Sequence, residues 1–232
     1  MITSNVLCRM LFIRAEQNGD PQYGTAFTID IDGKRYLVTA KHLLGDPIQV
    51  DNLEYMHDER WLSLPVRLVG TTRGETDIAV LAADIPLSDS LPLEPTLKGI
   101  IYSQDVYFVG YPYKMFMKAD ALAGRPAPFV KKGILSSAVD ITSGMFFVDA
   151  LNNEGFSGGP VVFLPLEEPE PRQLRVGGVV SKFKVESEHV LDQQLERNGM
   201  SVTYNTGFMV AYDIAYAVRL IRANPVGFPI SA

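Results

Sequence analysis

Short apolar segments separated by turn residues run along most of the chain. Residues 23–31 and 34–40 are rich in β-branched and aromatic side chains, and the pair Asp32-Gly33 between them is a strong hairpin signal. Further strands are predicted at residues 61–69, 78–82, 105–110, 133–141, 145–148, 160–164, 174–184 and 207–210. Many short strands at regular spacing, with glycine and proline spread between them, are typical of a β-sandwich or a β-barrel.

One segment has a convincing helical period. Residues 211–223 place four apolar side chains on roughly one stripe, and Asn224-Pro225 follows as a stop signal. The pattern therefore predicts an all-β body closed by one C-terminal α-helix at residues 211–224. The apolar residues of the stripe are Ile214, Val218, Leu220 and Ile221.

Composition narrows the class of protein. The chain has 232 residues, 47% of them hydrophobic, so it can bury a substantial core without metals or cross-links. The formal net charge of −6 argues against a nucleic-acid-binding protein, which would usually present a basic face. Three scattered histidines, one cysteine and no nucleotide-type glycine loop predict neither a metal site nor a cofactor.

The cysteine count and the N-terminus bear on location. Cys8 is the only cysteine, so no intrachain disulfide can form, which favours a reducing compartment. Residues 1–14 lack the ordered features of a signal peptide, and the apolar run 6–13 is interrupted by Arg9 and too short to span a bilayer. We therefore expect a cytoplasmic protein that does not enter the membrane.

The strongest chemical signal is the glycine-rich segment 155–160, Gly-Phe-Ser-Gly-Gly-Pro, which precedes an apolar run. A nucleophilic serine must expose its oxygen while nearby backbone N–H groups point at one spot, and glycines permit such a tight turn. Gly155 and Ser157 could then donate their N–H groups to the oxyanion of a tetrahedral intermediate. A plain glycine-rich hairpin before a strand explains the segment equally well when it is taken alone.

Two further motifs carry an imidazole and a carboxylate. His42 follows the buried strand segment 37–40, where a rigid strand end can hold a general base. Asp77 directly precedes the apolar segment 78–81 and can orient a histidine. Each motif alone also fits an ordinary turn residue next to a strand. The other two histidines, His57 and His189, lie among acidic residues and are expected to be solvated.

The order of the three motifs decides between these interpretations. His42, Asp77 and Ser157 follow the chymotrypsin-like order rather than the subtilisin or α/β-hydrolase order. Their separations are large enough to place the histidine and the aspartate on one barrel and the serine on another. A triad of these three residues is therefore predicted.

From about residue 24 to residue 211, the chain resembles the trypsin-like, S1-type serine peptidases, and most of all the disulfide-free bacterial branch that includes the HtrA (Deg) proteases. Seven segments carry the resemblance in order: residues 24–27, 37–42, 76–81, 106–112, 149–154, 178–181 and 206–210. The resemblance implies two packed six-stranded antiparallel β-barrels of the chymotrypsin type within one peptidase domain. Residues 1–100 would form the barrel with His42 and Asp77, and residues 101–210 the barrel with Ser157.

The resemblance also assigns roles. Ser157 would be the nucleophile, His42 the general base and Asp77 the orienting acid, with the N–H groups of Gly155 and Ser157 forming the oxyanion hole. The substrate would be an extended protein or peptide segment added as a strand. Its neighbours would be the backbone of Ser181, Lys182 and Phe183. Leu151, six residues before the serine, would form the floor of the specificity pocket and favour small or medium apolar residues before the cut.

Phe156 departs from the family pattern, because the secreted members carry an aspartate there and the HtrA branch an asparagine. Activation by a new N-terminal amine that pairs with that aspartate is therefore not available. A bulky phenyl group beside the oxyanion hole would also hold the hole misformed until something rearranges it. We therefore expect a latent enzyme that needs an activating partner, a ligand or oligomerisation. We expect no PDZ-like module directly after the helix in this sequence, which would be either a free protease or the protease domain of a longer protein.

Three other interpretations compete with a serine endopeptidase. A catalytically inactive scaffold would use the same barrels to bind peptides, although all three triad residues are present. A cysteine peptidase would need a thiol in the nucleophile's place, but Cys8 lies near the N-terminus and is expected to be a small core residue of the first strand. An esterase could use the same triad, and the strand at the border of the cleft favours peptides instead.

Overall fold

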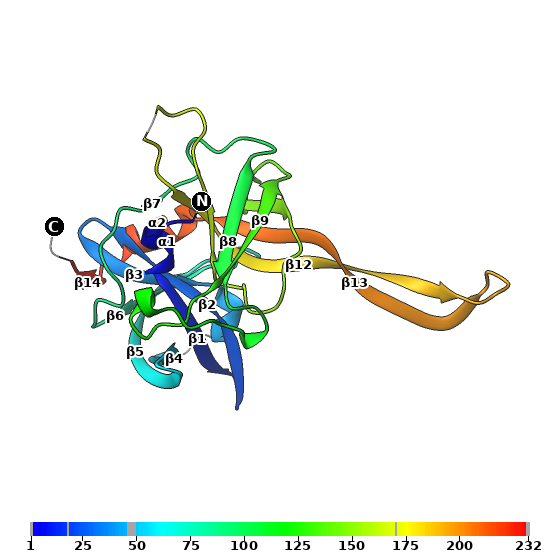
Figure 1. Cartoon of the computed structure of the whole chain (residues 1–232), viewed down its shortest axis with the longest axis horizontal. Helices are drawn as coiled ribbons and strands as arrows, with labels where there is room; N and C mark the ends of the chain where they lie inside the picture. The colour runs from blue at the N-terminus through cyan, green and yellow to red at the C-terminus, as the bar shows by residue number, and fades with distance from the viewer. Residues whose placement is uncertain (1, 18, 46–49, 170, 231–232) are drawn as a thin grey trace.

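The computed structural model describes residues 2–17, 19–45, 50–169 and 171–230, which form two β-barrels and a long hairpin that extends away from them (Figure 1). In the first barrel six antiparallel strands follow the order β3-β2-β1-β4-β5-β6, and pairing of β3 with β6 closes the ring. A short strand, β14 (Phe228–Pro229), adds to the start of β3. The six strands are β1 (Met10–Gln17), β2 (Asp20–Ile31), β3 (Lys34–Thr39), β4 (Asn52–His57), β5 (Arg60–Thr71) and β6 (Ala79–Ala83).

The second barrel has the same construction. Its antiparallel strands follow the order β11-β8-β9-β10-β13-β12, and β11 also pairs with β12. The two-residue strand β7 (Glu94–Pro95) adds parallel to β12. The six strands are β8 (Asp105–Gly110), β9 (Phe129–Leu135), β10 (Met145–Asp149), β11 (Pro160–Phe163), β12 (Arg175–Leu191) and β13 (Arg197–Asp213).

Helices are few among the described residues. The α-helices are α1 (Ser4–Leu7) and α2 (Ala215–Ala223), and 3-10 helices cover Lys41–Leu44, Pro112–Lys114 and Asp120–Leu122. After β13 the chain returns to the first barrel, where α2 packs against β5 and β6. The side chain of Asn224 then donates to the Val69 carbonyl at 3.0 Å. None of the described helices is long and apolar enough to cross a membrane.

Aromatic side chains join the two barrels. Phe12 on β1 stacks on Tyr111, which follows β8, with 4.9 Å between the ring centroids. Both rings are buried, and the Tyr111 hydroxyl donates to the Pro126 carbonyl at 3.0 Å. Burial of such large rings stabilises the contact between the barrels, and this contact fixes where the ends of their strands meet.

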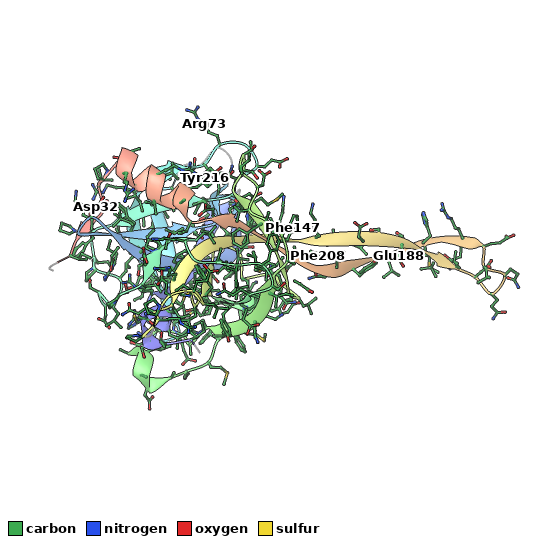
Figure 2. The ribbon with its side chains drawn as sticks, turned by 90° about the horizontal axis from the view of Figure 1, so that it is seen from above. Asp32, Arg73, Phe147, Glu188, Phe208 and Tyr216 are labelled. Carbon is green, nitrogen blue, oxygen red and sulfur yellow. The ribbon has the colours of Figure 1, made fainter. Side chains whose placement is uncertain are left out.

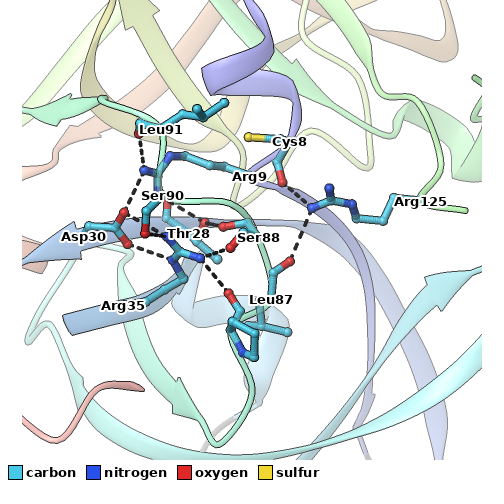
Figure 3. Close-up of polar contacts among 11 residues, drawn as sticks. Cys8, Arg9, Thr28, Asp30, Arg35, Leu87, Ser88, Ser90, Leu91 and Arg125 are labelled. Carbon is cyan, nitrogen blue, oxygen red and sulfur yellow. Dashed lines mark hydrogen bonds and ion pairs between the residues drawn. The ribbon is translucent and has the colours of Figure 1, made fainter. Parts of the chain in front are cut away.

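A buried polar cluster holds the N-terminal segment against the chain that leaves the first barrel (Figure 3). The Asp30 carboxylate accepts from Arg9 and from Arg35, each at 2.8 Å, and Arg35 also donates to the Pro86 carbonyl at 2.8 Å. Both guanidinium groups are almost completely buried. Such burial is tolerated because the charges are paired and carbonyl groups accept several of the other donors, although Arg9 Nε has no hydrogen-bond partner among the described residues.

The hairpin of β12 and β13 is the most unusual element. Each strand has 17 residues. The inner half of β12, up to Ser181, is buried in the barrel, whereas nearly all side chains from Lys182 onward are exposed. Figure 1 shows the pair leaving the body as a two-stranded ribbon, and Figure 2 shows Glu188 far out along it.

The predicted fold class is confirmed: two six-stranded antiparallel barrels with a C-terminal helix. Some boundaries were wrong. The strand predicted at residues 133–141 lies at Phe129–Leu135, and the helix begins at Ala215 because residues 211–213 still belong to β13. The ranges of β1, β4 and the outer hairpin were missed, and Cys8, expected on the first strand, lies buried between α1 and β1.

Candidate active site

The closing pair of the first barrel brings His42 and Asp77 together. Thr39 at the end of β3 pairs with Ala79 at the start of β6. Because the two strands run antiparallel, residues just after Thr39 and just before Ala79 lie at the same end of the barrel. His42 lies there on a 3-10 helix, and Asp77 lies two residues before β6.

Hydrogen bonds then fix the orientation of the imidazole. His42 Nδ1 lies 2.6 Å from Asp77 Oδ2, and the His42 backbone N–H donates to Asp77 Oδ1 at 2.9 Å. The Ser181 hydroxyl also donates to Oδ2. Burial by itself would raise the pKa of Asp77, whose side chain is only 10% exposed, but the hydrogen bonds from His42 and Ser181 hold the pKa below its ordinary value. Asp77 is therefore a buried carboxylate.

Glycines shape the turn that carries Ser157. Gly155 and Gly158 have φ values of +98° and +82°, which side chains rarely tolerate. A Cβ atom at Gly155 would overlap the Tyr111 carbonyl oxygen, and one at Gly158 would overlap that of Thr25. The Ser157 carbonyl accepts from the Thr25 N–H at 2.9 Å, so the turn is tied to β2 of the first barrel.

Ser157 and His42 line one cavity of about 350 Å³ between the barrels. In the described structure the Ser157 hydroxyl donates to the Ser181 carbonyl at 2.8 Å. Ser181 therefore contacts both Ser157, through its carbonyl, and Asp77, through its hydroxyl. The cavity is lined by Pro21, Gln22, Tyr23, His42, Leu43, Tyr113, Lys114, Glu154, Gly155 and Ser157.

The N–H groups of Gly155 and Ser157 are available to a ligand. The Glu154 carbonyl accepts from the Tyr113 N–H at 2.9 Å. In a trans peptide the N–H points opposite to the carbonyl, so the Gly155 N–H is directed away from Tyr113. Within the hydrogen bonds of the described residues, neither this N–H nor that of Ser157 has a protein acceptor.

Phe156 points into the second barrel. Its side chain is completely buried, and its ring meets Phe108 edge to face with 4.9 Å between centroids. The Lys131 ammonium lies 5.8 Å from the centroid of the ring. The phenyl group therefore belongs to the core behind the serine turn.

The predicted substrate-binding residues lie in two places. Ser181 contacts the serine, and Lys182 and Phe183 follow it on β12, exposed and half-buried respectively. Leu151 is 55% exposed, and its carbonyl accepts from the Lys131 ammonium, which also donates to Asn153 Oδ1 at 2.8 Å. The role of Leu151 as a pocket floor stays a prediction.

Sequence reasoning missed two side chains near the site. Thr25 donates from Oγ1 to the Gly155 carbonyl at 2.7 Å. Lys131 donates to the Leu151 carbonyl and to Asn153, and burial lowers the pKa of its ammonium group. Thr25 stands in the segment 24–27 that carries the family resemblance, whereas nothing marks Lys131 in the sequence. Across the described ranges, no three His, Cys, Asp or Glu side chains are grouped so that they could hold a metal ion.

Comparison with solved structures points to the same fold. The serine endoprotease from Yersinia pestis matches with a TM-score of 0.55 and 22% identity over 94% of this chain and 65% of that chain. The HtrA-type protease AlgW, solved with a tripeptide, matches with a TM-score of 0.58 and 20% identity over 95% and 61%. The chain thus spans less than two thirds of either relative, and at these identities the similarity shows the fold alone.

Sequence comparison identifies the family. No curated protein gives a significant match to this chain. The family model of the trypsin-like peptidase domain matches residues 24–163, which include His42, Asp77 and Ser157 and make up more than half of the chain. The chain therefore belongs to the trypsin-like peptidase family.

Proposed function

We propose that the protein is a serine endopeptidase that hydrolyses peptide bonds through Ser157, His42 and Asp77. One observation carries the proposal: the 2.6 Å contact between His42 Nδ1 and Asp77 Oδ2 orients the imidazole in the cavity that Ser157 also lines. A buried carboxylate in that place keeps the proton on Nδ1 and leaves Nε2 free to act as a base.

The residues then have these roles. The Ser157 hydroxyl leaves the Ser181 carbonyl, transfers its proton to His42 Nε2 and attacks the scissile carbonyl carbon. The N–H groups of Gly155 and Ser157 stabilise the oxyanion, and Asp77 stabilises the imidazolium. The imidazolium protonates the leaving amine, so that an acyl-enzyme forms on Ser157. A water molecule, activated by His42, then attacks the ester carbonyl and releases the acid.

Latency is the finer part of the proposal. The Ser157 hydroxyl is bonded to Ser181, and none of the hydrogen bonds among the described residues joins Ser157 to His42. We expect a ligand, a partner or oligomerisation to shift the serine toward the histidine. The Phe156 ring lies in the core, so the resting hydrogen bond of Ser157 is the feature that would hold the enzyme inactive.

The substrate is proposed to be an extended protein segment with a small or medium apolar residue before the cut. Two features support this: Ser181 borders the serine, and the predicted pocket residue Leu151 is uncharged. Cleavage profiling on a peptide library tests the preference, and a clear preference for arginine would contradict it.

Labelling with a fluorophosphonate probe tests the function directly. We expect Ser157 to be modified in the wild-type protein and no modification in Ser157→Ala. Mass spectrometry of a mixed proteome should show new cut sites that depend on Ser157. A wild-type protein that stays unlabelled, with and without candidate activators, and that still binds peptides would instead support the alternative of an inactive scaffold.

A further inference from the structure

One edge of β12 is open beyond the barrel. On that side β12 pairs with β11 only from Arg175 to Val179, whereas on the other side its pairing with β13 continues to Leu191. No other described strand pairs with β12 past residue 179. An extended strand with a row of unpaired backbone groups is a template for another extended chain.

The direction of the backbone groups along this edge follows from one contact. The Lys184 carbonyl accepts from the Thr206 hydroxyl on β13 at 3.0 Å, so residue 184 faces β13. Successive residues of a strand face opposite edges, so Phe183, Val185, Ser187 and His189 present their N–H and carbonyl groups to the open edge.

The open edge is also continuous. The pairing is irregular between Phe183, which lies opposite Met209, and Val185, which lies opposite Asn205. Over this step β12 advances by two residues and β13 by four. The extra residues therefore lie on β13, and β12 remains regular from Lys182 to His189.

This edge begins at the catalytic centre. The Ser181 carbonyl lies 2.8 Å from Ser157 Oγ, so the residue that carries the scissile carbonyl must lie opposite Ser181. Counting along an antiparallel pairing places the third residue before the cut opposite Phe183 and the ninth opposite His189. A substrate that pairs at the cleft is therefore already aligned with the hairpin.

We propose that the outer half of β12 is an extended substrate-docking strand for the residues that precede the cleaved bond, out to about the ninth residue by this register. The inference rests on the proposed peptidase function. Its occupant is an unstructured polypeptide that adds as a third strand to the hairpin.

The side chains on one face define the chemistry of that occupant. Glu186 and Glu188 are exposed on β12 opposite Tyr204 and Val202, and neither carboxylate has an ion-pair partner among the described residues. The Tyr204 hydroxyl donates to Glu188 at 3.0 Å, and Tyr204 and Val202 are 42% and 56% exposed. A lysine or arginine would place its ammonium or guanidinium group at a glutamate and its aliphatic stem along these two side chains.

The preference is therefore for basic residues at the sixth and eighth positions before the cut, opposite Glu186 and Glu188. Three peptides with one cleavage sequence test this: one with four residues before the cut, one with ten and lysine at positions six and eight, and one with ten and glutamate there. We expect kcat/KM of the long basic peptide to exceed that of the short peptide at least about tenfold, because several hydrogen bonds and two charge pairs are added. The double variant Glu186→Lys with Glu188→Lys should reverse the preference between the two long peptides, and Glu196→Lys at the hairpin tip is the matched control.

A pair of proline variants separates edge pairing from hairpin integrity. Ser187 and Thr203 lie directly opposite each other. Since Ser187 faces the open edge of β12, Thr203 faces the outer edge of β13, and proline at either position removes an N–H that no strand uses. Both variants also lose the same hydroxyl contact of 2.7 Å between these two residues. We expect Ser187→Pro to remove most of the advantage of the long basic peptide and Thr203→Pro to preserve it.

Binding to Ser157→Ala, measured by fluorescence anisotropy with the same peptides, gives a readout that does not require catalysis. Cleavage of the short peptide without any gain for the long ones would overturn the docking strand and leave the peptidase standing. Absence of cleavage and of Ser157 labelling, with tighter binding of the long basic peptide, would overturn the peptidase only. If Ser187→Pro changed the sedimentation of the protein rather than the peptide preference, the edge would pair with a second copy of this chain and the inference would fall.

Discussion

Replacement of Asp77 by asparagine tests the geometry on which the proposed chemistry depends. The asparagine keeps an oxygen for the His42 backbone N–H, which now donates to Oδ1 at 2.9 Å. Its amide nitrogen then stands where Oδ2 meets His42 Nδ1 at 2.6 Å and accepts from the Ser181 hydroxyl. An amide nitrogen only donates. The substitution therefore favours the imidazole tautomer whose proton is on Nε2, and that nitrogen can no longer accept the proton of Ser157.

The expected loss of reactivity at Ser157 is large because the substitution favours the His42 tautomer that cannot act as the base, rather than only making the imidazole more mobile. We expect the second-order rate constant of fluorophosphonate labelling to fall about 10³- to 10⁴-fold, which corresponds to about 4–5.5 kcal/mol of transition-state stabilisation. The thermal unfolding midpoint, measured on the same samples, checks that the barrels remain folded. Labelling across a range of pH values shows whether the residual reaction depends on a different base.

Ser181→Ala is the matched control for this experiment. It removes one hydrogen bond to Asp77 but leaves both contacts of the carboxylate with His42. The labelling rate should therefore fall by less than about tenfold, as expected for a single hydrogen bond. If Asp77→Asn labelled as fast as Ser181→Ala, the carboxylate would not orient the histidine, and the proposed triad would be refuted.

Three further predictions concern the turn, the core and the N-terminal cluster. Gly158→Ala adds a Cβ against the Thr25 carbonyl at a φ of +82°, so Ser157 labelling should fall at least about 100-fold; unchanged labelling would contradict the strained turn. Phe156→Ala empties a buried site and should lower the free energy of unfolding in urea by about 3–5 kcal/mol; a change under about 1 kcal/mol would place the ring outside the core. Burial by itself would raise the pKa of Asp30, but hydrogen bonds from Arg35 and Arg9 hold the pKa below its ordinary value. The ion pairs therefore stabilise the fold fully above the pKa of an unfolded aspartate, about 3.9, and this stabilisation is lost as the pH falls through the lower folded-state pKa. Asp30→Asn should be about 3 kcal/mol less stable than the wild type at neutral pH but lose less stability in acid, and an equal loss for both proteins between neutral and acidic urea curves would refute this.

Much of the barrel architecture could be predicted from local patterns. The Asp32-Gly33 turn lies between β2 and β3 as expected, and the predicted strand at residues 105–110 matches β8 at both ends. Such segments are predictable because one face, or both, is buried, and burial selects β-branched and aromatic side chains. The strand pattern indicated a β-sandwich or β-barrel, and the resemblance carried by seven segments implied the two six-stranded barrels.

The outer hairpin was missed by these patterns. Residues 185–191 and 197–206 are mostly exposed on both faces, and only residues 200–205 alternate between apolar and polar side chains, so most of the hairpin lacks the pattern of a half-buried strand. They form strands because each pairs with the other, starting from the buried inner halves of β12 and β13. The sequence pattern ends the first of these strands at residue 184, seven residues before the structure does.

The candidate site divides along the same line. The residue types, their order and the glycines around Ser157 were present in the sequence and indicated an imidazole, a carboxylate and a hydroxyl for one reaction. The proximity of His42 and Asp77 depends on the pairing of Thr39 with Ala79 in the first barrel. The hydrogen bond from the Ser181 hydroxyl to Asp77 depends on contact between the two barrels, which are far apart in sequence. Local side-chain preferences determine which segments become strands and turns, whereas only the closure and packing of the barrels determines which turns meet, because those contacts join residues separated by tens of positions.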